Sequence, residues 1–128
     1  MNYSNEVPFS TLCGLTLSAI DRSGDESITF IVDESLKFVM RHDQDCCETV
    51  SIEDVNGDLS DLVGSPILKA EESSNSDDPK KDEYDDSHTW TFYHIRTNKG
   101  TVTIRWYGTS NGYYSESVSL YKMTNGVD

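Results

Sequence analysis

Basic residues are scarce in this sequence. Its 128 residues contain 10 Lys and Arg against 23 Asp and Glu, which gives a formal net charge of −13 at pH 7. A surface with this charge repels phosphate backbones, so direct nucleic-acid binding is disfavoured. The same charge attracts a basic partner, although it would also serve simply to keep a small protein in solution.

Long apolar runs and enzyme motifs are missing as well. The longest apolar runs, such as residues 28–32, fall far short of the ~20 residues of a membrane helix. The start of the chain has no basic region followed by an apolar segment, and no Gly-rich phosphate loop, GxSxG, HExxH or EF-hand loop occurs. We therefore expect a soluble, cytoplasmic protein that is not an enzyme and has no cofactor.

Cysteine is limited to Cys13, Cys46 and Cys47. The count is odd, and two adjacent cysteines on an extended strand would point to opposite faces and form a strained ring if they were joined. A chain of this length can also fold as one domain without a disulfide. Reduced thiols are therefore expected.

Short alternating runs separated by turn residues fill most of the chain. In "ITFIV" (28–32), "LKFVM" (36–40) and "TVTIRWY" (101–107), every second residue is apolar, which is typical of strands with one buried face. "HTWTFYHIR" (88–96) is apolar or aromatic on both faces and reads as a central strand. These runs predict hairpins in series that form one antiparallel sheet of about six or seven strands.

One short stretch has a helical period instead. Leu59, Leu62 and Val63 are spaced i, i+3, i+4, with Asp58 or Asn56 near the start of the stretch and Gly64 beyond its end. The spacing predicts one or two helical turns. Together with the strands, it predicts a β-rich α+β fold with one short helix.

The composition divides the chain into three parts, with a loop inside the second. We expect an N-terminal segment at 1–14, a single β-rich domain at 15–122 and a frayed tail at 123–128. Within the domain, "EESSNSDDPKKDEYDD" (71–86) has almost no apolar residues and an excess of acids, so it cannot form a core. A mobile loop is expected at about 72–86.

The stretch "HDQDCCETV" (42–50) has an unusual density of residues that could bind a metal or a ligand. His42, Asp45 and Glu48 are candidate binding residues, and His42 with Cys46 forms a weak candidate metal site. There is no CxxC knuckle, so a metal would need a further histidine supplied by the fold. The neighbouring acids raise the pKa of a thiol, which disfavours cysteine catalysis. The alternative is that these side chains only make turn and strand hydrogen bonds.

Aromatic residues and arginine gather near the C-terminus, around a predicted turn. These residue types anchor interfaces or stack on planar ligands, but they can also fill a small β core. The candidate binding residues here are Arg105, Trp106, Tyr107, Asn111, Tyr113 and Tyr114.

Two long motifs resemble a family of small phage-encoded proteins that has only a domain-of-unknown-function label. The motifs are "RHDQDCCETVSIEDVNGDLSDLVGSPILKAEE" and "HTWTFYHIRTNKGTVTIRWYGTSNGYYSESV", and the likeness spans residues 15–118. The resemblance implies a phage accessory protein, a class that often binds and inactivates host factors, including defence systems. A looser likeness, in size and in the aromatic residues beside "NGYY", is to phage proteins that sequester nucleotide immune signals.

These observations lead to three functional hypotheses. The first is stoichiometric binding of a host protein with a basic surface, in DNA-mimic fashion, in the cytoplasm of the infected cell. The second is sequestration of a nucleotide-like small molecule in a pocket formed by aromatic residues and arginine. The third is a small metal-dependent enzyme. Self-association through exposed sheet edges also stays open.

Overall fold

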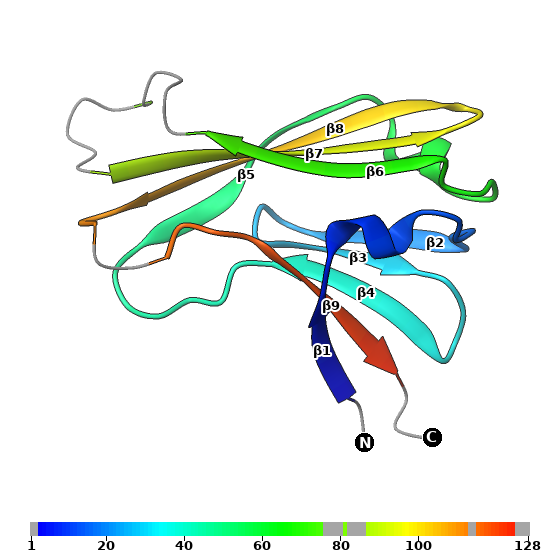
Figure 1. Cartoon of the computed structure of the whole chain (residues 1–128), viewed down its shortest axis with the longest axis horizontal. Coiled ribbons are helices and arrows are strands. Elements are labelled where there is room, and N and C mark those ends of the chain that lie inside the picture. The colour runs from blue at the N-terminus through cyan, green and yellow to red at the C-terminus, as the bar shows by residue number, and fades with distance from the viewer. Residues whose placement is uncertain (1–2, 76–80, 82–86, 113–114, 125–128) are drawn as a thin grey trace.

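The computed structural model is a sandwich of two antiparallel β-sheets (Figure 1). It describes residues 3–75, 81, 87–112 and 115–124. The first sheet has five strands in the order β1 (Tyr3–Val7), β9 (Ser119–Thr124), β4 (Leu36–Arg41), β3 (Ser27–Ile31) and β2 (Ala19–Ser23). The second has four strands in the order β5 (Thr49–Asn56), β8 (Gly100–Ser110), β7 (Ser87–Thr97) and β6 (Lys69–Asn75).

The predicted α+β fold with one sheet of six or seven strands is wrong. The described part of the chain forms nine strands in two sheets. Its helical segments are two four-residue 3-10 helices, η1 (Phe9–Leu12) and η2 (Leu59–Leu62), so the class is all-β. The partition into two sheets arises because the chain changes layer between β4 and β5 and returns at its end, where β9 inserts between β1 and β4. No helix in the described residues is long and apolar enough to span a membrane.

The core lies between the inner faces of the two sheets. Ile28 and Phe30 of β3 are fully buried, as the alternating pattern predicts. Val102, Ile104 and Trp106 of β8 meet them from the other sheet and are also fully buried. Burying each large side chain contributes about 1.5–3 kcal/mol, so this interface is the main source of stability.

Two buried polar contacts join the sheets across the core. The indole Nε1 of Trp106 donates to the sulfur of Met40 at 3.1 Å, and the hydroxyl of Tyr93 donates to the carbonyl oxygen of Val118 at 3.2 Å. Burial raises the pKa of Tyr93, which keeps its phenol protonated and able to donate. These contacts satisfy polar groups that the core would otherwise leave unpaired.

The predicted helical turn is confirmed as a single turn of 3-10 helix at η2. The Asp58 side chain accepts a hydrogen bond from the backbone N–H of Ser60 at 3.0 Å, which is an N-cap contact. A hydrogen bond from the Ser60 hydroxyl, at 2.8 Å, and then this N–H contact lower the pKa of Asp58. Leu62 then points into the core and is fully buried.

The ends of the chain and the acidic segment contain more structure than their composition predicts. The N-terminal segment contains β1 and η1, and β9 continues through Thr124. Residues 72–75 of the predicted loop belong to β6, and Lys81 is also described. The other residues of the predicted loop, and residues 125–128 of the predicted tail, lie outside the described residues.

Two leucines provide a matched test of this packing. Leu62→Ala removes a fully buried side chain and should lower the free energy of unfolding by about 2–5 kcal/mol, whereas Leu68→Ala, at a residue 52% exposed, should change it by less than ~0.5 kcal/mol. Urea denaturation of the two variants measures both changes. Similar losses for both would mean that η2 does not close the core.

Candidate functional site

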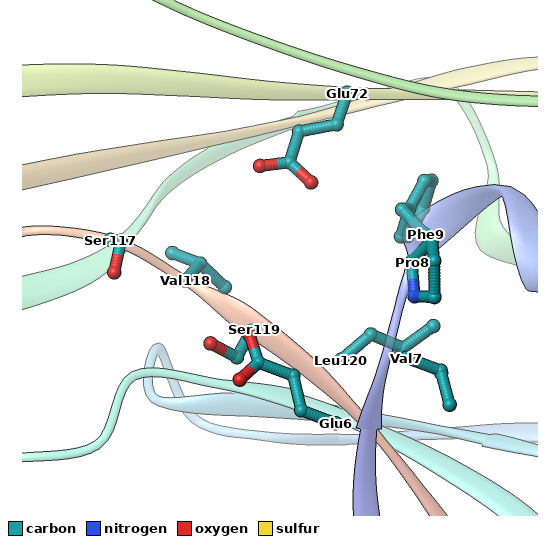
Figure 2. A pocket seen from close by; sticks show the side chains of 9 residues that line it. All are labelled: Glu6, Val7, Pro8, Phe9, Glu72, Ser117, Val118, Ser119 and Leu120. Carbon is teal, nitrogen blue, oxygen red and sulfur yellow. The ribbon is translucent and has the colours of Figure 1, made fainter.

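A cavity of about 500 Å³ opens between the two sheets where β1 and β6 lie at their edges. Its wall comes from β1, β9 and the chain beside them on one side and from β6 on the other (Figure 2). The lining residues are Glu6, Val7, Pro8, Phe9, Glu72, Ser117, Val118, Ser119 and Leu120.

The cavity lies where the inner face of β6 stops being apolar. Ala70 points inward and is buried, and Glu72, two residues later, occupies the next inward position. A carboxylate does not pack into the core as an aliphatic side chain would, and Glu72 is exposed. The apolar core therefore ends at Glu72, which lines the cavity.

Two carboxylates from different sheets face this cavity. In Figure 2, the side chain of Glu72 points down from β6 and that of Glu6 points up from β1, toward the same space. Glu72 is exposed at the mouth of the cavity, but the part of its surface that is covered raises its pKa, and the negative charge of Glu6 raises it further. Neither carboxylate has a cationic partner within the described part of the chain, so the site is suited to a positively charged group.

The stretch from His42 to Glu48 forms a different structure, a loop that carries the chain from the first sheet to the second. The Glu48 carboxylate is at its centre, with its side chain 0% exposed. It accepts the backbone N–H groups of Asp45 and Cys46, each at 2.9 Å, and Nε2 of His42 lies 2.7 Å from it. The Cys46 N–H is the largest of the contacts that lower the pKa of Glu48 to about 2, so the group is ionised.

His42 connects this loop to the segment before β9. Its Nδ1 lies 2.6 Å from the carbonyl oxygen of Ser117, and its Nε2 faces the Glu48 carboxylate. The His42 side chain is 5% exposed. The structure therefore brings the predicted residues His42 and Glu48 together as a buried, hydrogen-bonded pair that holds the loop, while Asp45 joins it through its backbone.

The predicted reduced cysteine pair is wrong. The structure joins Cys46 and Cys47 by a disulfide, in a loop rather than on the strand that the prediction assumed. The sulfur of Cys46 is therefore not available as a metal ligand beside His42. Among the described residues, no group of three or more His, Cys, Asp or Glu side chains could hold a metal ion.

The aromatic residues near the C-terminus do not form one site. Trp106 is fully buried in the core, whereas Arg105 and Tyr107 lie on the opposite, outer face of β8. Asn111 lies in the turn after β8, and Tyr113 and Tyr114 lie outside the described residues. Alternation along the strand separates these side chains, although they are adjacent in sequence.

Trp90, which the sequence interpretation did not single out, completes an outer-face cluster on the second sheet. Its ring centroid lies 4.4 Å from that of Tyr107, and the guanidinium carbon of Arg105 lies 5.1 Å from the Trp90 ring. Lys81 covers this cluster in part, because its backbone N–H donates to the Tyr107 hydroxyl at 2.9 Å and its Nζ lies 2.5 Å from a Glu53 carboxylate oxygen. The face is thus partly occupied by the chain itself.

Glu116 is a further buried carboxylate that the sequence interpretation missed. Its two oxygens accept the hydroxyl groups of Thr89 at 2.8 Å and Ser110 at 2.5 Å. Gly108 allows this close packing, since a Cβ there would lie 2.9 Å from the Glu116 Cβ. With both oxygens engaged, Glu116 fastens the loop before β9 to the second sheet.

Comparison with known proteins identifies the family but no function. The model of a family described as domain of unknown function (DUF7448) matches residues 10–120, and the chain belongs to that family. No curated protein and no solved structure matches the chain.

Loss of the Glu48 carboxylate should loosen the loop between the sheets. Glu48→Gln replaces an acceptor oxygen with a donor group that faces other N–H donors, so the melting temperature should fall at neutral pH. Because folding lowers the pKa of Glu48 from 4.5 to about 2, its contribution is fully present above about pH 4.5 and disappears as the pH falls through about 2. Melts across this range should therefore show the difference from wild type shrinking with acid. Asp45→Asn, at an exposed side chain of the same loop, is the control and should melt like wild type.

The two glutamates of β6 should behave differently. Glu72→Gln removes a charge disfavoured by burial and by Glu6, so it should raise the melting temperature at neutral pH and low salt, with a smaller gain at high salt. Glu71→Gln is the control, because Glu71 lies on the outer face, 3.4 Å from the Lys69 ammonium, and should give no gain. Equal effects in the two variants would show that Glu72 does not face a charged cavity.

Proposed function

We propose that this member of the DUF7448 family is a stoichiometric binding protein whose partner presents a basic surface. The observation that carries the proposal is the cavity between the sheets, where Glu6 and Glu72 face the same space without a cationic partner in the described residues. A Lys or Arg side chain of a partner would neutralise both carboxylates. The added positive charge would offset the repulsion between the Glu6 and Glu72 carboxylates in the free protein.

The overall charge supports the same reading. With a net charge of −13, the protein's field attracts cationic surfaces over a Debye length of ~8 Å at physiological ionic strength and accelerates their encounter. Exposed acids occur on both sheets, among them Asp21 on β2 and Asp54 on β5. The whole surface would thus attract a basic partner, and the cavity would be the point at which one cationic side chain of that partner binds.

The setting we propose is a phage-infected cell. The resemblance of residues 15–118 to small phage-encoded proteins supports an accessory protein that acts in the host cytoplasm. Its partner would be a host protein, of which a defence protein with a DNA-binding surface is one class that an acidic mimic would fit. Binding alone inactivates such a target, so the proposal requires neither turnover nor a cofactor.

A second candidate, sequestration of a nucleotide immune signal, is favoured by one observation on the outer face of the second sheet. Arg105 lies over the Trp90 ring, and its Nε is a buried atom without a hydrogen-bond partner among the described residues. The rings of Phe92 and His94 stack beside it with centroids 6.4 Å apart. A planar anionic ligand would suit such a surface. Trp106 cannot contribute, however, because it lies in the core.

Capture experiments with charge-matched variants test the leading proposal. The double variant Glu6→Gln/Glu72→Gln should lose a partner that wild type captures from host lysate. Asp21→Asn/Glu26→Gln removes the same charge from exposed sites near the opposite edge of the first sheet and should retain it. Native mass spectrometry of the captured complex should give a fixed integer ratio, and capture should weaken steeply with salt.

Three results would overturn this proposal. Equal capture by both double variants would exclude the cavity as the contact point. A co-purified nucleotide that Arg105→Ala abolishes would favour the second candidate. Inactivation of a large molar excess of target would mean turnover and therefore an enzyme.

A further inference from the structure

The disulfide between Cys46 and Cys47 lies on the surface of the loop that joins the two sheets. Both cysteines are exposed, whereas Glu48, directly after them, is buried. Neither cysteine belongs to the hydrophobic core. Exposed disulfides are the ones that undergo thiol–disulfide exchange readily, so this bond is open to a reductant in solution.

A purely stabilising role explains this disulfide poorly. A disulfide stabilises a fold mainly by restricting the unfolded chain, and the effect grows with the number of residues in the loop that it closes. Cys46 and Cys47 are adjacent, so their bond closes the shortest loop that a chain can form, and it joins no two strands. Its effect on the folded protein is therefore confined to the loop that contains it.

Within that loop, the disulfide lies between a hydrogen-bond donor and its acceptor. The backbone N–H of Cys46 donates to Oε1 of Glu48 at 2.9 Å. The chain between these two groups passes through the peptide bond of Cys46 and Cys47, and the ring that the disulfide closes restricts the torsion angles on either side of that bond. The Cys46 N–H is also the contact that lowers the pKa of Glu48 most. The oxidised pair thus favours the conformation in which the loop binds the Glu48 carboxylate.

Glu48 in turn lies at the point where the two sheets are joined. Its Oε2 is 2.7 Å from Nε2 of His42, and Nδ1 of the same ring is 2.6 Å from the carbonyl oxygen of Ser117. His42 directly follows β4 and Ser117 shortly precedes β9, and these two strands are neighbours in the first sheet. Glu48 directly precedes β5 of the second sheet. A change at the cysteine pair can therefore reach both sheets through two hydrogen-bonded side chains.

We propose that the Cys46–Cys47 pair is a redox site that reacts with a dithiol and whose state controls how firmly the loop holds the two sheets together. A thiolate of the dithiol attacks one sulfur, the S–S bond breaks and a mixed disulfide forms, and the second thiol of the reagent then displaces the cysteine. Two electrons and two protons pass to the pair, which ends as two thiols, while the reagent ends as a disulfide. This inference goes beyond the proposed function and does not depend on a basic partner.

Reduction of the folded protein tests whether the site reacts. Wild type is first treated with oxidised dithiothreitol, then incubated with reduced dithiothreitol in the absence of denaturant, alkylated and weighed by mass spectrometry. The number of alkylated thiols should rise from one, on the free Cys13, to three, and in Cys13→Ser it should rise from none to two. Renewed treatment with oxidised dithiothreitol should restore the starting count.

NMR titration of the Glu48 carboxyl group tests whether the site controls the loop. The pKa of Glu48 should be about 2 in the oxidised protein and should move toward 4.5 on reduction, because the Cys46 N–H is then held less firmly. Hydrogen exchange of that amide should become about tenfold faster once the torsion angles are released. Cys46→Ser/Cys47→Ser should resemble the reduced protein and should not respond to dithiothreitol. Glu72, on β6, is the control and should titrate alike in both states.

Three results would overturn the proposal. Three alkylated thiols after treatment with oxidised dithiothreitol would mean that the adjacent cysteines do not form the bond. Reduction that occurs only when denaturant unfolds the protein would mean that the bond is not accessible in the fold. Reduction that leaves the pKa of Glu48 and the exchange of the Cys46 amide unchanged would mean that the pair does not control the loop.

Discussion

The packing of two apolar sheet faces against each other is the constraint on which every other feature depends. Phe30 and Met40 of the first sheet and Ile104 and Trp106 of the second are buried to 0% exposure only because the layers meet. The loop of residues 42–48 must then carry the chain from one layer to the other, and the hydrogen bonds of the Glu48 carboxylate to His42 and to backbone N–H groups fix its path. The cavity lies beside this packed core, at Glu72, where the apolar inner face of β6 ends.

Local patterns predicted the strands but not their grouping. Alternation gave the correct buried faces in β3 and β8, the hairpin of β7 and β8 has the expected short turn, and Asp58 caps a helical turn. The alternating pattern shows that one face of a strand is buried. It does not show whether that face is covered by part of the same sheet or by a second sheet. The insertion of β9 between β1 and β4 is a long-range pairing without a local signal, so the expected single sheet was wrong.

For the candidate residues too, the sequence pattern showed which residues are unusual, but not which of them contact each other in the fold. The density of polar groups singled out His42 and Glu48 as candidate binding residues, but only the fold shows that the two contact each other, are buried and engage backbone groups. Trp106 was named as a candidate binding residue near a turn, although the alternation of β8 already placed it on the same face as Ile104, which is in the core. Glu72 was missed because acidic composition suggested a loop, whereas an edge strand tolerates polar residues on both faces.

Glu6 and Glu72, from opposite sheets, share one cavity, in which the negative charge of Glu6 raises the pKa of Glu72. Titration of the Glu72 side-chain carboxyl carbon by NMR measures this directly, in wild type and in Glu6→Gln. We expect a pKa for Glu72 above its ordinary value of 4.5 in wild type and a lower value in Glu6→Gln, because the repulsion from Glu6 is removed while the partial burial of Glu72 stays. An unshifted pKa, or one that does not respond to Glu6→Gln, would contradict it.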